Sequence, residues 1–155
     1  MEFVKKKEVL SLVLEIYTDG STHPTNPGPG GFGIVITRNS QLITTYCKQF
    51  EYTTNNRMEM VAILWCLANY GKYTEEVIVY SDSSYAINTF TNWMFNWQRN
   101  NWCKSNNQTP ENLDIIQTYF NLLNMGYKIT LKKVKGHSGI QFNELADKLA
   151  RTGGV

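Results

Sequence analysis

Residues 13–22 read VLEIYTDGST, and this stretch decides how the chain begins to fold. Its first half is a continuous apolar and β-branched run, which is typical of a strand buried in a hydrophobic core. The run ends on Asp19, although a charged side chain is seldom buried unless it is paired or bound to a metal. We therefore predict a buried strand that delivers an acidic side chain to one edge of a sheet.

The length and composition limit the possible architectures. The chain has 155 residues, of which 42% are apolar, and this is enough for one domain with a real core but hardly enough for two. We expect a single domain over residues 1–155, with its core between about 12 and 151. The formal net charge is only +2, so attraction to a polyanion depends on where the charges lie.

The cysteines and the N-terminal segment indicate the cellular compartment. The three cysteines lie far apart and form no C-x-x-C pair, so we expect reduced thiols that pack in the interior. Basic residues near the N-terminus precede an apolar stretch, but Glu8 and Glu15 interrupt it, and no span of ~20 apolar residues follows. We expect a monomeric cytoplasmic protein that has no contact with a membrane.

Turn residues separate the first strand from the next two. Residues 26–31, NPGPGG, predict a tight hairpin connection in preference to a phosphate loop, because the lysine and the following helix are absent. Residues 31–39 and 41–52 are β-rich and are joined by Asn39 and Ser40. The first third of the chain therefore predicts a meander of three strands.

Helical and β patterns alternate in the rest of the chain. Apolar spacing predicts a helix over 55–70, with the threonines at 53–54 as capping candidates and Gly71 after its end. Pro110 and Gly126 mark the start and the end of a later helix. The remaining elements are a buried strand over 75–82, a helix that starts just after Asp82, a less regular stretch over 91–110, a strand over 127–136 and a helix over 141–154.

Four acidic residues lie on these elements, near what we expect to be one edge of the sheet. Asp19 and Asp82 end strands, whereas Glu59 and Asp147 lie on helices. Taken singly, each has an ordinary interpretation as a turn residue, a helix cap or a solvated helix residue. Brought together, the carboxylates would repel one another unless divalent cations offset the repulsion. Oxygen ligands without neighbouring histidine or cysteine favour Mg²⁺ or Mn²⁺ over zinc.

Five motifs carry a resemblance to a known family. They are YTDGS with NPGPGG, TTNNRMEM, YSDSSYAI, VKGHSG and NELADKLA, in the family's order and at its spacing. From about Leu12 to Arg151, the chain resembles a type 1 ribonuclease H, the enzyme that cuts the RNA strand of an RNA/DNA hybrid. The resemblance implies an α/β fold in which a mixed five-stranded sheet, with three antiparallel strands and then two parallel ones, is flanked by helices on both faces.

The resemblance also implies a reaction and a role for each acidic residue. The family hydrolyses a phosphodiester with two Mg²⁺ ions, for which Mn²⁺ can substitute, and leaves 5′-phosphate and 3′-hydroxyl ends. Asp19 would bridge both ions, and Asp147 would help to hold the ion that activates the attacking water. Glu59 and Asp82 would hold the ion that stabilises the leaving 3′ oxygen. His137 would assist proton transfer or product release.

Uncharged side chains at matching positions imply how a hybrid is held. The minor groove of a hybrid displays 2′-hydroxyls, and amides can donate to them and accept from them without reading a base. The matching positions are Asn26, Asn55 and Asn56 for the groove, and Thr54 and Asn112 for a pocket that grips a DNA phosphate. Tyr52 stands where the family often has an arginine beside this pocket.

A segment rich in Asn and Trp corresponds to the family's basic protrusion, which is a handle for the substrate. Trp93, Trp97 and Trp102 match its aromatic positions, but Trp93 and Trp97 are four residues apart and fit helix packing equally well. Between residues 93 and 114 the basic residues are Arg99 and Lys104. The predicted handle therefore carries little charge.

Two questions stay open at the level of the sequence. Lys132, Lys133 and Lys135 fit either a solvated strand edge or a patch that faces phosphates. The function has two alternatives to a hybrid-specific endoribonuclease. These are a catalytically silent hybrid-binding module and another nuclease of the wider superfamily.

Overall fold

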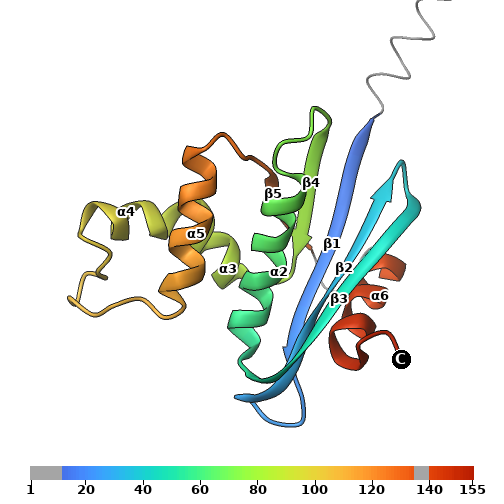
Figure 1. Ribbon diagram of the computed structural model, residues 1–155, viewed down its shortest axis with the longest axis horizontal. Coiled ribbons are helices and arrows are strands. Elements are labelled where there is room, and N and C mark those ends of the chain that lie inside the picture. The colour runs from blue at the N-terminus through green and yellow to red at the C-terminus, as the bar shows by residue number, and fades with distance from the viewer. Residues whose placement is uncertain (1–11, 135–139) are drawn as a thin grey trace, which may run out of the picture.

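The computed structural model describes residues 12–134 and 140–155, which form a five-stranded sheet with helices on both faces (Figure 1). The strand order is β3-β2-β1-β4-β5. The strands are β1 (Val13–Thr22), β2 (Gly28–Arg38), β3 (Gln41–Thr53), β4 (Glu76–Ser81) and β5 (Thr130–Lys133). The helices are α2 (Asn55–Tyr70), α3 (Ser84–Asn88), the π-helix η1 (Thr89–Trp93), α4 (Met94–Arg99), α5 (Leu113–Asn124) and α6 (Ile140–Thr152). No helix in these ranges is both long and apolar enough to cross a membrane.

The first three strands form the predicted antiparallel meander. β2 pairs with β1 and with β3 in antiparallel register, while β4 pairs parallel to β1 and β5 parallel to β4. Asn39 and Ser40 join β2 to β3, and their φ angles of 52° and 64° suit the tight turns that match strand twist. The predicted turn over residues 26–31 is wrong in part, because β2 already begins at Gly28.

The side chains of β1 alternate between the two layers of helices. Leu14 and Ile16 are buried in a core that includes Met58 of α2. On the other face, the ring of Tyr17 lies 5.5 Å from the ring of Phe142 in α6. The predicted burial of this strand therefore holds on the face toward α2, whereas the second face is only half-buried and the burial alternates along β1.

Helix α2 begins and ends where the sequence predicts. The Thr54 hydroxyl accepts a hydrogen bond from the backbone N–H of Arg57 at 3.1 Å, and the Gly71 N–H donates to the Leu67 carbonyl at 2.8 Å. α2 packs against the sheet on one side and α5 on the other, so its buried surface is wider than a single apolar stripe. Met60 faces this second contact and is fully buried.

The second half of the chain departs from the predicted boundaries. Residues 91–110 contain ordered helix, since η1 leads directly into α4. α5 begins at Leu113 and not at Pro110, because Asn112 has a left-handed backbone with φ of 60° that interrupts any earlier turn. β5 is only four residues long.

Candidate metal centre

Asp19 lies within β1, three residues before the strand ends at Thr22, so the prediction that Asp19 ends the strand is wrong. Helices approach both faces of the sheet at this point. It pairs with Gly33 of β2, and its own Oδ1 accepts a hydrogen bond from the Gly20 N–H at 2.8 Å. A Cβ atom built on Gly20 would lie 2.5 Å from the backbone nitrogen of Glu59. The missing side chain at Gly20 therefore lets α2 rest on the strand and brings Glu59 beside Asp19.

Gly33 allows an equally close approach on the opposite face of the sheet. A Cβ atom built on Gly33 would lie 2.4 Å from the carbonyl oxygen of Ala146 in α6. Because Gly33 is the sheet partner of Asp19, this close approach brings the Asp147 segment of α6 to the other side of Asp19. The two glycines thus determine which acidic residues surround Asp19.

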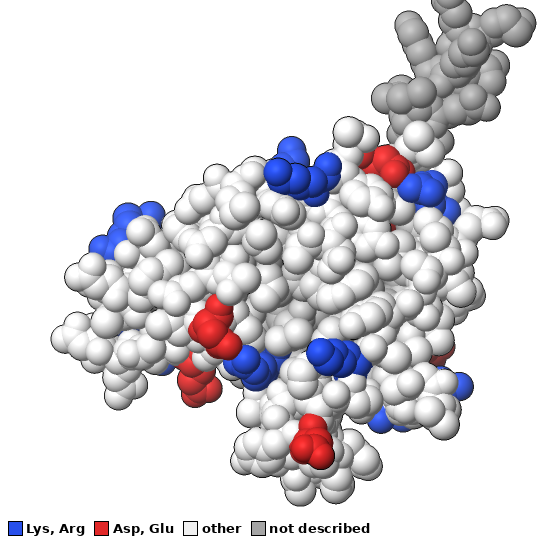
Figure 2. Space-filling view, viewed as in Figure 1, with Lys and Arg blue, Asp and Glu red and all other residues white. Residues whose placement is uncertain are grey.

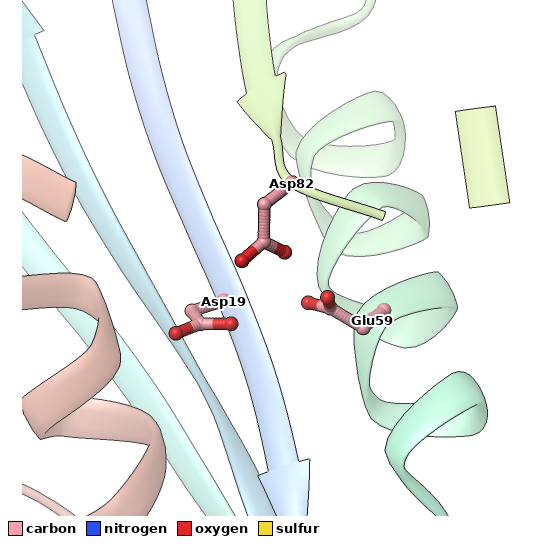
Figure 3. A group of neighbouring side chains, drawn as sticks. All are labelled: Asp19, Glu59 and Asp82. Carbon is pink, nitrogen blue, oxygen red and sulfur yellow. The ribbon is translucent and has the colours of Figure 1, made fainter. Parts of the chain in front are cut away.

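Three carboxylates meet at this edge (Figure 3). Oxygens of Asp19, Glu59 and Asp82 all lie within 4.8 Å of one another. Asp82 follows β4, and the next residue, Ser83, caps α3 by accepting from the N–H of Ala86 at 3.0 Å. β4 is parallel to β1, so both strands deliver an aspartate to the same edge of the sheet.

Glu59 is the most enclosed of the three. It is 9% exposed, and its Oε1 atom is buried with no hydrogen-bond partner among the described residues. A buried carboxylate oxygen without a partner is costly, whereas a bound cation would satisfy it. The acid-only ligand set suits a hard divalent cation that prefers oxygen ligands.

Burial and mutual repulsion raise the pKa values in this cluster. The pKa of Asp19 rises from its usual 3.8 to about 7, chiefly because of burial and then because of the Asp82 charge. The pKa of Glu59 rises well above its usual value, chiefly because of burial and then because of its hydrogen bond with Asp82. The ionised forms of these carboxylates therefore destabilise the folded protein unless a cation is bound.

Asp147 lies beside the trio but is not one of its members. Its Oδ2 accepts a hydrogen bond from Nε of Arg151 at 3.0 Å, while its hydrogen bond and charge also help to raise the pKa of Asp19. The predicted cluster of four acids is thus three close carboxylates with a fourth next to Asp19. His137 lies outside the described residues.

The predicted groove residues form one hydrogen-bonded group at the start of α2. The Asn55 side-chain oxygen accepts from the N–H and the hydroxyl of Thr22, at 2.7 and 3.0 Å. The Asn55 N–H in turn donates to Oδ1 of Asn26 at 3.1 Å. Asn56 is exposed beside them, and Thr54 is the residue that caps α2. These residues therefore lie together on one surface next to Glu59.

Asn112 is held by a residue that the sequence analysis did not single out. Arg57 donates to Oδ1 of Asn112 at 3.1 Å and forms an ion pair with Asp114 at 2.7 Å. Arg57 lies inside the TTNNRMEM motif, three residues after the cap Thr54. Its place in this motif could have identified it from the sequence. Through Arg57, the start of α2 fixes the start of α5.

The two predicted handle tryptophans both contact aromatic neighbours. The Trp93 ring lies 5.7 Å from Tyr85 and 6.2 Å from Trp97, and the Trp102 ring meets Phe120 edge-on at 5.3 Å. Both are partly exposed. On the face of the molecule in Figure 2, Lys and Arg side chains are scattered over wide uncharged areas.

Comparison with known proteins decides the family. The family model for RNase H matches residues 12–154. The chain belongs to the ribonuclease H family. It is 45% identical to ribonuclease HI of Rickettsia prowazekii over 141 residues, which are 89% of this chain and 88% of the relative. It is 42% identical to ribonuclease H of Actinobacillus succinogenes over 140 residues, which are 90% of this chain and 88% of the relative.

Solved structures confirm the predicted fold. The solution structure of the PFV RNase H domain matches with a TM-score of 0.75 at 22% identity, over 93% of both chains. The structure of LC11-RNase H1 in complex with RNA/DNA hybrid matches with a TM-score of 0.62 at 23% identity, over 88% of this chain and 93% of the other. The predicted nuclease class is confirmed through the family, which is metal-dependent, and the acidic trio could bind a metal.

The raised pKa of Asp19 predicts how the metal-free fold responds to pH. Between about pH 4 and 7 the folded protein binds more protons than the unfolded chain, so the free energy of unfolding falls as the pH rises and levels off above that window. Thermal unfolding in chelator should therefore give a lower melting temperature at pH 8 than at pH 5. Added Mn²⁺ should raise the melting temperature more at pH 8, because its ligands are then deprotonated.

The control for this pH series is Asp19→Asn, which removes the titrating group. Its melting temperature in chelator should change less between pH 5 and pH 8 than that of the wild-type protein. A wild-type melting temperature that rises over the same interval would contradict the assignment.

Proposed function

We propose that the protein is an endoribonuclease that hydrolyses the RNA strand of RNA/DNA hybrids and acts as a monomer in the cytoplasm. The observation that carries this proposal is the trio of Asp19, Glu59 and Asp82, with a buried and unpartnered oxygen on Glu59, in a ribonuclease H fold. A module that only binds hybrids has no need of such a cluster, because its charges repel both one another and the phosphates of the substrate. The relatives named above are ribonucleases, which supports the same conclusion.

We assign the four acids to two Mg²⁺ ions, for which Mn²⁺ can substitute. When bound, such a pair lowers the pKa of an attacking water and stabilises charge on the leaving oxygen. Asp19 is central to the cluster and is the residue proposed to bridge both positions. Glu59 and Asp82 would hold one ion, and Asp147 would help to hold the other.

Two features of the chain suit these roles. Asp19 has acids on both sides, since α2 brings Glu59 to one side and α6 brings Asp147 to the other. The Arg151 guanidinium pairs with Asp147 and so limits the repulsion between Asp147 and Asp19. His137 is proposed to assist proton transfer or product release.

The groove and handle residues are proposed to hold the hybrid. Asn26 and Asn55 are linked by a hydrogen bond, so the loop before β2 and the start of α2 would present their amides as one surface. Such amides can engage 2′-hydroxyls without selecting a base. The remaining proposed contacts are Asn56 in the groove, Thr54 and Asn112 at a DNA phosphate, and Trp93 and Trp102 in the handle.

A panel of labelled substrates tests this function. The protein should cut the RNA strand of an RNA/DNA hybrid with Mg²⁺ or Mn²⁺, and chelator should abolish cutting. Duplex DNA, duplex RNA and the single strands should stay intact. Binding of the hybrid without cutting would favour the silent binding module, and cutting of duplex DNA would favour another nuclease of the superfamily.

A further inference from the structure

The two lysines that end β5 have equal charge but point to opposite faces of the sheet. Lys132 pairs with Tyr80 of β4, and Lys133 pairs with Ser81. Successive side chains of a strand alternate between its faces. The Tyr80 ring stacks on Tyr17, on the face that α6 covers, so Lys132 lies on that face. Lys133 therefore lies on the other face.

Contacts of Lys133 place its side chain at the start of α3, the helix that follows Asp82. Its Nζ donates a hydrogen bond to the hydroxyl of Ser84, two residues after Asp82. The next residue, Val134, donates its N–H to the Ser81 carbonyl at 2.9 Å, so the end of β5 stays against the segment that carries Asp82. Both Lys133 and Ser84 are exposed. The ammonium group is thus accessible to solvent at the start of α3, two residues along the chain from Asp82.

The charge of Lys133 is also uncompensated. Arg151 pairs with Asp147 and Arg57 pairs with Asp114, whereas Lys133 has no carboxylate partner within the described ranges. Its hydrogen-bond partner is a neutral hydroxyl, and an ammonium group has three donors, so it can still bind an anion. Beside a centre that processes a phosphodiester, the anion available is a backbone phosphate.

We propose that Lys133 binds a backbone phosphate of the strand that enters the metal centre, with the Ser84 hydroxyl holding the ammonium group in place. This proposal rests on the proposed function, since it assumes a nucleic-acid substrate at the acidic trio. Lys133 is a positioning residue, because it acts on the substrate away from the reacting atoms. Lys132 carries the same charge but points to the opposite face of the sheet, away from the Ser84 hydroxyl that holds Lys133.

Hybrid binding across a salt series tests the proposal, with chelator present to prevent cutting. Each phosphate contact contributes about 0.9 to the slope of log affinity against log salt concentration. Lys133→Gln should therefore reduce the slope by about 0.9 and weaken binding about 8-fold at 0.1 M salt. In cleavage assays, KM should rise by a similar factor while kcat stays within about threefold. Lys133→Arg keeps the charge and should restore the slope.

The matched control is Lys132→Gln, which removes one charge at the neighbouring position and should leave the slope and KM unchanged. Equal slopes for Lys133→Gln, Lys132→Gln and the wild-type protein would overturn the proposal while leaving the proposed function intact. A lower melting temperature for Lys133→Gln with an unchanged slope would also overturn it, since Lys133 would then only support α3. Failure of the wild-type protein to cut the hybrid would overturn the proposed function itself.

Discussion

Asp19→Asn should lower kcat for hybrid cleavage by about 10³-fold or more, because it removes the proposed ligand shared by both ions. The same change should stabilise the metal-free protein. Asp19 is buried among acids that raise its pKa to about 7, so its negative charge costs folding free energy at pH 8. Each kcal/mol of relieved repulsion should raise the melting temperature by about 3 °C in a chain of this size.

Single-turnover cleavage with Mn²⁺ and thermal unfolding in chelator test this prediction. The matched control is Glu76→Gln, because Glu76 is exposed at the other end of β4 from Asp82. Glu76→Gln should keep full activity and the wild-type melting temperature. Cleavage that persists in Asp19→Asn would contradict the proposed mechanism. A melting temperature of Asp19→Asn below that of the wild-type protein would show that Asp19 stabilises the metal-free fold.

Gly20→Ala should destabilise the protein by about 3 kcal/mol, at the upper end of the cost of overpacking. Its Cβ would lie 2.5 Å from the Glu59 nitrogen and 2.5 Å from the Met58 carbonyl carbon, and these backbone atoms cannot rotate away. α2 must then move from β1 and carry Glu59 away from Asp19. We expect Mn²⁺ affinity to fall more than about tenfold, since a ligand is displaced.

Urea unfolding in chelator and a calorimetric Mn²⁺ titration measure the two effects separately. The matched control is Gly126→Ala, because no atom lies within 4 Å of the added Cβ and only the φ of 93° disfavours a side chain. It should cost about 1 kcal/mol and leave Mn²⁺ affinity unchanged. Wild-type stability in Gly20→Ala would show that α2 can move without cost, and would remove the steric explanation for the site.

The sequence by itself determined the elements whose signals are local. The strand that carries Asp19, the turn at Asn39 and Ser40, and the cap at Thr54 each depend on residues within a few positions. The order of the motifs indicated the family, and the motifs contained the acidic residues that became candidate metal ligands. Local signals failed where tertiary contacts prevail, as at the left-handed Asn112 that delays α5.

Only the tertiary structure decided which side chains meet. Close approach of α2 at Gly20 and of α6 at Gly33 makes Asp19 the centre of the acidic group, and neither contact is visible in the local pattern. The same holds for Lys132 and Lys133, which are the same residue type with the same charge but point to opposite faces of the sheet. The physical reason is that sequence spacing fixes backbone conformation over a few residues, whereas steric fit between distant elements fixes the distances over which charges and ligands interact.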